Sequence, residues 1–405
     1  MTAVILASLL YFPAGLVLGG VLATGQAEPL RWLSVGLYLA ALLAFCLRRS
    51  GKRRRWCYGA AALCSGLAVL IFCGVAGRYW PWSHGLMLGV ANFVLLALVD
   101  CLFRIRRAGS FVLAAMLVAG MLIPARAYLW PLNSPVPSLR PPLVIMTSLP
   151  IAPMQGRAIG DILRGEDGLN PVAALLSRHF QLRFIDFLSR DTLAGAKQLL
   201  LAHPRAMQPR ELVALDDWVR GGGKVVILAD PLLAWPSSFP LGDPRNPPVT
   251  SLLDPLLAHW GLELEPVRDG PVRKVLLNRR LLVTAGASRF SITSRTCATQ
   301  ADGLIARCHL ASGTALVIAD ADLLNPARWM KGNRPDNLEI NRTADNMQLL
   351  LQWLGVPQSH LAPPLAWIFS VNAMASGFAA ALLPLLLLLF LPAAHGIIWN
   401  NARDR

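Results

Sequence analysis

Residues 198–231 read QLLLAHPRAMQPRELVALDDWVRGGGKVVILADP, and this stretch decides the fold of the globular part of the chain. Two short runs, 199–202 and 224–229, are apolar without alternation, which is typical of strands buried on both faces. The segment between them has the pattern of one helix. A strand, a helix and a second strand in this order predict a parallel sheet with helices covering both faces.

The connecting helix is predicted over 211–220, where apolar residues recur at helical spacing. They are Leu212, Leu215 and Val219, with Trp218 widening the stripe. Glu211 is expected on the opposite, polar face. Gly221 is expected to end the helix in a left-handed conformation, and the run 221–223 is interpreted as a bare connector rather than a phosphate-binding loop.

The same alternation extends in both directions. Strands are predicted over 143–150 and 182–188, with a helix over 170–180 between them, so four strands alternate with helices. Further along follow a Pro-rich loop (235–248), a helix (251–262), a β-rich stretch (273–310), a strand (314–324) and a closing helix (343–355). The predicted fold class is α/β, a doubly wound and mostly parallel sheet with an insertion that contains a β-hairpin.

The rest of the chain predicts membrane helices. The chain has 405 residues, of which 55% are hydrophobic, and the apolar residues gather at the two ends. Six segments are near the length of about 20 residues that spans a bilayer. Five precede the globular part (2–24, 30–47, 56–77, 83–103 and 110–130) and one follows it (363–394). The predicted domains are therefore 1–130 (membrane), 131–142 (linker), 143–362 (globular), 363–394 (membrane) and 395–405 (tail).

The charge distribution predicts the orientation of these helices. The formal net charge is +15, but residues 131–363 hold 24 basic against 20 acidic residues, so most of the excess lies beside the membrane segments. This placement argues against nucleic-acid binding. The basic loops at 48–55 and 104–107 are expected in the cytoplasm, and membrane topology alone explains their charge. Contact of the loop 48–55 with an ATPase or with anionic membrane lipid is the alternative. Both termini are then cytoplasmic, and residues 131–362 lie on the periplasmic side of a bacterial inner membrane.

One acidic residue lies within a predicted span. Asp100 is expected to pair with Arg104 or Arg106 one turn further along the helix; a role in a polar pathway through the membrane is the alternative.

Two cysteines test the predicted compartment. Cys297 and Cys308 flank Asp302-Gly303, a dipeptide favoured in two-residue hairpin turns. Pairing outward from that turn places the two cysteines opposite each other, which predicts a disulfide and agrees with an extracytoplasmic location. The count makes them a hydrogen-bonded pair, a less usual site for a bridge, so a shifted register is the alternative.

The globular part resembles a known family. The features that carry the resemblance are LVALDDWVRGGGKVVILADP, a strand that ends in Asp, and a closing helix, TADNMQLLLQWLG, that begins Asp-Asn and ends Trp-Leu-Gly. Together they resemble the extracytoplasmic domain of gliding-motility-type (GldG-like) ABC transporter auxiliary proteins. The resemblance implies an amidotransferase- or flavodoxin-like fold, and an ABC permease and a separate ATPase as partners.

Catalytic motifs do not emerge from the sequence. The predicted strands end in Asp230-Pro231 and His203-Pro204 where an amidotransferase needs a thiol, and the chain contains no G-x-S-x-G, H-E-x-x-H or P-loop motif. No cofactor or metal is predicted. Polar residues at strand ends line the usual ligand crevice of open α/β sheets; here they are Thr147, Ser148, His203, Asp230, Asp320 and Asp322.

These strand-end residues leave two interpretations open. Asp320 and Asp322 are two residues apart on a predicted strand, so they are expected to share a face; if the crevice binds a ligand, a metal ion or a cationic molecule would suit this pair. In the alternative interpretation the three aspartates cap turns, and His203 is a loop residue before proline.

The sequence therefore predicts a non-catalytic membrane subunit of an ABC-type transport or envelope-assembly complex. Its globular domain would bind a protein partner, a small molecule or an envelope ligand. A membrane-anchored hydrolase acting on envelope sugar or peptide, and a purely structural scaffold, are the alternative functions.

Overall fold

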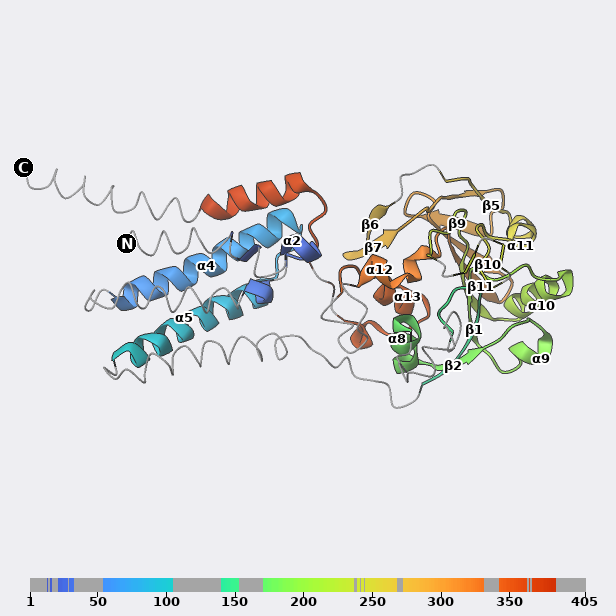
Figure 1. The fold of residues 1–405 in the computed structure, drawn as a ribbon, viewed down its shortest axis with the longest axis horizontal. Helices are drawn as coiled ribbons and strands as arrows, with labels where there is room; N and C mark the ends of the chain where they lie inside the picture. Colours follow the sequence, from blue (N-terminus) through green and yellow to red (C-terminus); the bar gives the residue numbers. More distant parts are fainter. Residues whose placement is uncertain are drawn as a thin grey trace, which may run out of the picture. The chain divides into compact units, whose positions relative to one another are not determined.

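The computed structural model describes residues 13, 15–16, 21–27, 29–32, 54–104, 140–152, 170–236, 239–240, 242–243, 245–267, 272–330, 342–362, 364 and 366–383. The chain divides into two compact units. One unit is Asn133–Pro364, and the other combines Met1–Leu132 with Leu365–Arg405. Figure 1 shows both with their elements labelled.

The globular unit is a mixed α/β structure around a seven-stranded sheet. The strand order is β2-β1-β3-β4-β11-β10-β9. The strands are β1 (Pro142–Thr147), β2 (Gln181–Phe184), β3 (Gln198–Ala202), β4 (Lys224–Leu228), β9 (Cys297–Gln300), β10 (Ile305–Leu310) and β11 (Gly313–Ile318). The first four and β11 are parallel, whereas β9 and β10 pair antiparallel. The order of the five parallel strands is that of a doubly wound sheet.

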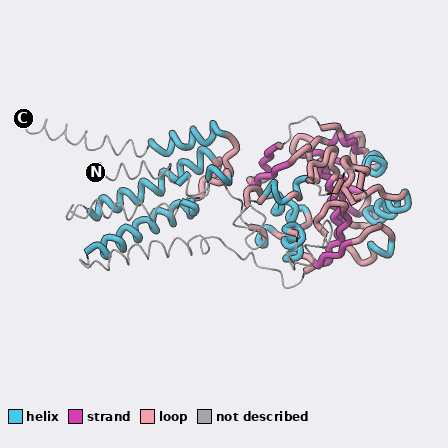
Figure 2. Tube along the Cα trace, viewed as in Figure 1, coloured by secondary structure: helices cyan, strands magenta, loops and turns pink. Residues whose placement is uncertain are grey.

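Helices cover this sheet on both sides. Figure 1 places α8 (Pro171–His179), α12 (Pro326–Trp329) and α13 (Asn346–Trp353) on one side, and α9 (Arg190–Leu193), α10 (Pro209–Arg220) and α11 (Asp254–His259) on the other. In Figure 2 the strands form the layer between them. The central strands are buried in full because both faces are covered: Leu199, Leu200 and Leu201 of β3 are 0% exposed.

The helix α10 begins and ends for identifiable reasons. Pro209 occupies its first turn, where no N–H is required, and Leu215 and Val219 are fully buried. The left-handed residue after the helix is Gly222 (φ 110°), not Gly221 (φ −72°), so the predicted position was one residue early. The glycine run works as a connector, because it lets the chain turn from α10 directly into β4.

The hairpin β9–β10 carries the predicted disulfide. Cys297 pairs with Cys308 in the predicted register, and the two Sγ atoms are bonded, with the Cα atoms 4.0 Å apart. The hydrogen-bonding expectation was wrong. His309 N–H donates to the Thr296 carbonyl (2.9 Å), so 296 and 309 form the hydrogen-bonded pair and the cysteines do not. The loop therefore has four residues, 301–304, three of which have positive φ.

Two small sheets complete the globular unit. One pairs β5 (Leu262–Leu264) with β8 (Phe290–Ile292), and the other pairs β6 (Arg273–Leu277) with β7 (Arg280–Thr284). Asn346, at the start of α13, holds β7 in place: its Oδ1 accepts from Val283 N–H (2.9 Å), and its Nδ2 donates to the Val283 carbonyl (2.7 Å). The side-chain amide thus acts like one residue of a neighbouring strand.

The second unit contains two long apolar helices, α4 (Arg54–Ala76) and α5 (Trp82–Arg104). By length and composition one of the described helices, Tyr58–Ala76, could cross a membrane. Shorter apolar helices cover Trp82–Leu98 and Val371–Leu383. Most of the spans predicted over 2–24 and 30–47, and all of that over 110–130, lie outside the described residues, so six spans remain a prediction.

Close contacts join α4 to α5. A Cβ on Gly66 would lie 3.3 Å from the Gly85 carbonyl oxygen of α5, so small residues allow the two backbones to approach. Tyr58 of α4 donates a hydrogen bond to Asp100 Oδ1 of α5 (3.0 Å). The arginine pairing predicted for Asp100 concerns side chains outside the described part of the structure.

Residues 25–27 pair with residues 366–368 within this unit. Gln26 and Trp367 form an antiparallel bridge, Ala27 N–H donates to the Ala366 carbonyl (2.6 Å), and Ile368 N–H donates to the Gly25 carbonyl (2.7 Å). The segment that follows the globular unit is thereby attached to the segment that begins the chain.

Candidate functional site

The six predicted site residues lie at the carboxyl ends of four parallel strands, β1, β3, β4 and β11. At the end of β1, Thr147 Oγ1 accepts from Leu149 N–H (2.9 Å), and Ser148 N–H donates to the His203 carbonyl (3.3 Å). Both residues therefore stabilise the turn that follows β1, and both are partly exposed.

His203 closes a turn at the end of β3. It is fully buried, with φ 45°, and its Nε2 lies 2.7 Å from the Pro248 carbonyl oxygen. Its Nδ1 is buried without a hydrogen-bond partner in the described part of the chain. Burial lowers the pKa of His203, and the Pro248 carbonyl only partly opposes this. The neutral tautomer with the proton on Nε2 fits this geometry.

The three aspartates are fully buried and accept hydrogen bonds from backbone N–H groups of neighbouring loops. Asp230 accepts from Leu232 (2.9 Å), Ala321 (2.7 Å) and Asp322 (3.2 Å). Asp320 accepts from Ala285 (2.7 Å) and Leu323, and Asp322 accepts from Ala234 (2.6 Å). The carboxylates therefore join the loops after β4, β7 and β11.

Asp320 and Asp322 do not share a strand face, which contradicts the sequence prediction. The strand β11 ends at Ile318, and Asp322 begins a 3-10 turn, η3 (Asp322–Leu324). The apolar run continues past the strand because these residues are buried in a turn, and burial alone does not distinguish a turn from a strand.

Burial makes these carboxyl groups reluctant to ionise. Desolvation and the charge of Asp322 raise the pKa of Asp230 to about 7, although the backbone donors oppose this. Desolvation and the Asp230 charge raise the pKa of Asp320 well above its usual value. Desolvation also raises that of Asp322, against the attraction of Arg328. Among the described residues, no group of three His, Cys, Asp or Glu side chains could hold a metal ion.

The strand-end residues also fasten the Pro-rich segment 231–251 to the sheet. Leu233 N–H donates to the Val249 carbonyl (2.8 Å), which closes the base of the loop. His203 contacts Pro248 and Asp322 contacts Ala234, one on each side of that base. The observed chemistry of these side chains is thus hydrogen bonding to loops.

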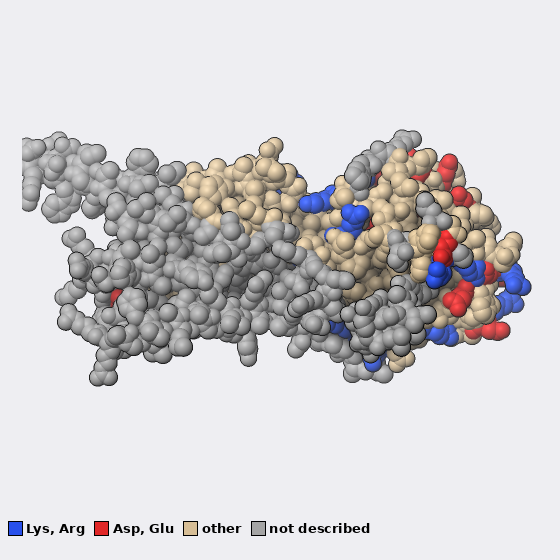
Figure 3. Space-filling model, viewed as in Figure 1, with Lys and Arg blue, Asp and Glu red and all other residues tan. Residues whose placement is uncertain are grey.

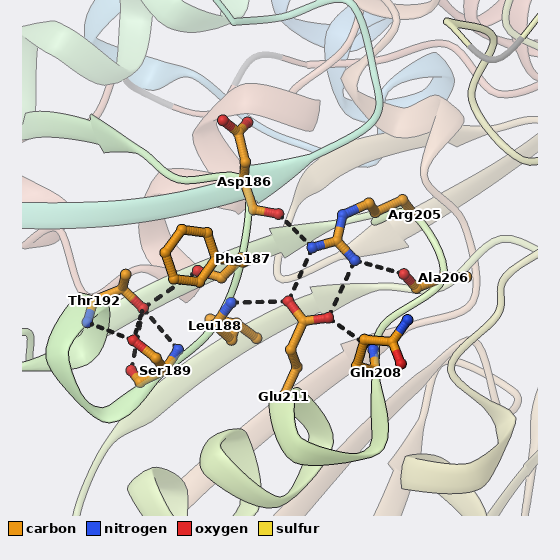
Figure 4. A network of polar contacts seen from close by, with 9 residues as sticks. All are labelled: Asp186, Phe187, Leu188, Ser189, Thr192, Arg205, Ala206, Gln208 and Glu211. Atoms are coloured by element: carbon orange, nitrogen blue, oxygen red, sulfur yellow. Dashed lines mark hydrogen bonds and ion pairs between the residues drawn. The ribbon is translucent and has the colours of Figure 1, made fainter.

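A second polar site lies between the loop after β2 and the start of α10, and sequence reasoning missed it. Its centre is Glu211, which is 3% exposed rather than on the polar face of the helix. Figure 4 shows its carboxylate between two segments. It accepts from both terminal nitrogens of Arg205 (2.9 and 3.1 Å) and from the N–H groups of Leu188 (3.1 Å) and Gln208 (2.7 Å).

The environment of Glu211 favours the charged form. Burial opposes ionisation, but the hydrogen bonds from Arg205, Gln208 and Leu188 outweigh it and hold the pKa below its usual value. The sequence contained one signal for this site. Gln208 and Glu211 are three residues apart at a helix start, which is the spacing of a capping box. The contact with Leu188, 23 residues earlier, has no such local signal.

Comparison with known proteins gives a family match in the first part of the globular unit. Residues 141–268 match the model of a family described as an ABC-type uncharacterized transport system. The match supports an ABC transporter auxiliary protein. It also supports a transport-associated role. The matched residues include the Glu211 site, His203 and Asp230, and end before Asp320 and the disulfide.

No curated protein matches the chain. Two solved structures have low overall likeness. One is the exo-beta-1,4-mannosidase Op5Man5 from Opitutaceae bacterium strain TAV5 (13% identity, TM-score 0.28, 51% of this chain and 35% of that one). The other is a beta-galactosidase from Rahnella sp. R3 (11% identity, TM-score 0.28, 69% and 36%). The chain spans about a third of the length of either enzyme, and likeness at this level does not assign a function.

Proposed function

We propose that this protein is a non-catalytic integral membrane subunit of an ABC-type transport or envelope-assembly complex. Its globular unit is an extracytoplasmic domain that binds a protein partner or an envelope ligand. The observation that carries the proposal is the family match over 141–268, which lies wholly inside the globular unit. A permease and a separate ATPase are the proposed partners.

Three features support the membrane topology within this proposal. The helix Tyr58–Ala76 is apolar and long enough to span a bilayer, and the bridge between Gln26 and Trp367 joins a segment that precedes the globular unit to one that follows it. The disulfide between Cys297 and Cys308 favours an oxidising compartment for the globular unit. A domain tethered at both ends cannot diffuse, so it suits a fixed position beside a permease.

The proposal extends to the family, the fold type and the roles of the strand-end residues. Kinship with GldG-like proteins and an amidotransferase-like fold are supported by the order β2-β1-β3-β4-β11, which is doubly wound. At the strand ends we propose that the aspartates brace loops, because they accept six backbone hydrogen bonds. A ligand bound at this edge would contact Thr147 and Ser148, which are partly exposed.

Co-purification tests the proposal. The intact protein is tagged, extracted from its native membranes in mild detergent, and its partners are identified by mass spectrometry, with an unrelated tagged membrane protein of similar abundance as the control. We expect specific recovery of an ABC permease and its ATPase. Recovery of envelope-synthesis enzymes alone, or of nothing above the control, would refute the transport assignment.

A further inference from the structure

An open groove of about 670 Å³ lies between the loop after β2 and the helix α10. Its lining includes Phe187, Ser189, Arg190, Gln208, Arg210 and Val213. In Figure 3, blue and red side chains alternate at the end of the globular unit where Figure 1 places α9 and α10. The helices α9 and α10, which contribute residues to the groove, lie on the opposite side of the sheet from α8, α12 and α13 (Figure 1).

The groove is held open by its own hydrogen bonds. Glu211, on α10, accepts from Leu188 N–H in the facing loop, and Arg205 donates to both Glu211 and the Asp186 carbonyl. The contacts in Figure 4 therefore brace one wall against the other. A binding surface that is already in place loses little conformational entropy when a partner docks.

The exposed side chains of the groove are of types that favour contacts with other proteins. Phe187 and Val213 are 55% and 59% exposed. The side chain of Arg210 is exposed and makes no hydrogen bond or ion pair with any other residue that the structure describes. Arg190 is 87% exposed and touches Asp217 at 3.5 Å, a weak exposed pair that a competing carboxylate can replace. Arginine and aromatic residues are enriched at interface centres.

We propose that this groove docks an acidic extracytoplasmic segment of a partner subunit. A carboxylate of the segment pairs with Arg210 and a second one with Arg190, while an apolar side chain between them packs on Phe187 and Val213. An acidic partner fits the charges of the groove, because Arg205 and Glu211 neutralise each other and the positive charge of Arg210 has no acidic side chain beside it. The inference rests on the proposed function, since it names the surface by which the globular unit contacts its complex.

Site-directed crosslinking locates the partner. Val213 is replaced by the photocrosslinker p-benzoylphenylalanine in the intact protein, which is irradiated in native membranes, and the crosslinked peptide is sequenced. The same crosslinker at Ile292, which is 37% exposed and outside the groove, is the control. We expect position 213, and not 292, to crosslink to a segment that contains two or more acidic residues.

Charge reversal tests the recognition itself. Arg190→Glu with Arg210→Glu is expected to lower both the crosslink and partner recovery by about tenfold or more. The matched control is Arg295→Glu with Arg307→Glu, two exposed arginines outside the groove, and it should change recovery by less than about twofold. Lysines in place of the acidic residues of the crosslinked segment should then restore binding to the reversed groove.

The outcomes separate this inference from the proposed function. Suppose that the wild-type protein recovers an ABC permease. The inference is then overturned if the charge-reversed variant recovers as much partner as the wild type does. It is also overturned if position 213 gives no crosslink, or if the crosslinked segment contains no acidic residues. If the wild-type protein recovers no permease, the proposed function fails. An acidic segment crosslinked at 213, with rescue by charge exchange, still supports the groove in that case.

Discussion

Replacing Asp230 by asparagine should change how the stability of the globular unit depends on pH. Asp230 is fully buried, its pKa is raised to about 7, and the ionisable groups that face it are Asp320 and Asp322, with Arg328 beyond Asp322. Asparagine keeps the shape and one acceptor oxygen, but it cannot ionise. The comparison therefore isolates the free energy of placing one negative charge among these groups.

The sign follows from proton binding. The folded protein holds the proton of Asp230 more tightly than the unfolded chain does, so the free energy of unfolding is highest in acid and falls as pH rises from about 4 to about 7. The gap between the two pKa values, 3.8 and about 7, corresponds to about 4 kcal/mol. Between about pH 5 and about pH 8, roughly 3 kcal/mol of this loss should be observed.

The variant should be the less stable protein in acid and the more stable one above neutral pH. Asparagine presents an N–H₂ group where one backbone N–H of Leu232 or Ala321 needs an acceptor, which costs about 1 kcal/mol. At about pH 3, where ionisation of Asp230 has cost the wild type almost nothing, we therefore expect Asp230→Asn to be less stable by about 1 kcal/mol, and at about pH 8 to be more stable by about 3 kcal/mol.

Hydrogen exchange of peptides from β4 and β11 at several urea concentrations measures the free energy of unfolding of the globular unit within the intact protein. His203 acts in the opposite direction, because its lowered pKa makes stability fall as pH drops below about 6.5. That contribution is common to both proteins and cancels in their difference. Parallel pH profiles for the wild type and the variant would show that Asp230 keeps an ordinary pKa, and would refute the reasoning.

Three further perturbations have defined outcomes. Replacing Cys297 and Cys308 by serine should lower the free energy of unfolding by about 3 kcal/mol, because the bridge closes a loop of 11 residues. Urea unfolding of the oxidised wild type and of the variant measures this loss, and equal midpoints would contradict the prediction. Glu211→Gln should lower the free energy of unfolding by about 2 to 3 kcal/mol, because it leaves Arg205 without its charged partner. The control Asp217→Asn, in the exposed pair with Arg190, should lower it by less than about 0.5 kcal/mol. Thermal unfolding measures both, and similar losses of stability in the two variants would disprove the difference. Gly313→Ala should cost about 3 kcal/mol or more, because its Cβ would collide with the Val219 carbonyl oxygen, and retention of wild-type hydrogen exchange in β11 would count against this packing.

Local pattern determined much of the fold. The apolar runs at 199–202 and 224–229 became β3 and β4 because strands buried on both faces have a continuous hydrophobic signature. The pairing of Cys297 with Cys308 was also predictable, since counting outward from Asp302-Gly303 sets the register. Which of the opposed residue pairs exchange hydrogen bonds was not predictable. This depends on whether the loop has two or four residues, and both loops give the same register.

The tertiary structure decided the sites. From sequence, Glu211 belongs to the polar face of α10, yet the loop after β2 folds over it, and Leu188, 23 residues away, supplies a donor. In the same way Asp230 and Asp322 are 92 residues apart and become coupled only because β4 and β11 are neighbours in the sheet. The sequence by itself thus determined the strands, the helix pattern and the cysteine register, which depend on residues close in the chain. Which polar residues are buried, and whether they brace a loop or face a groove, was decided by contacts between distant segments, which no local spacing encodes.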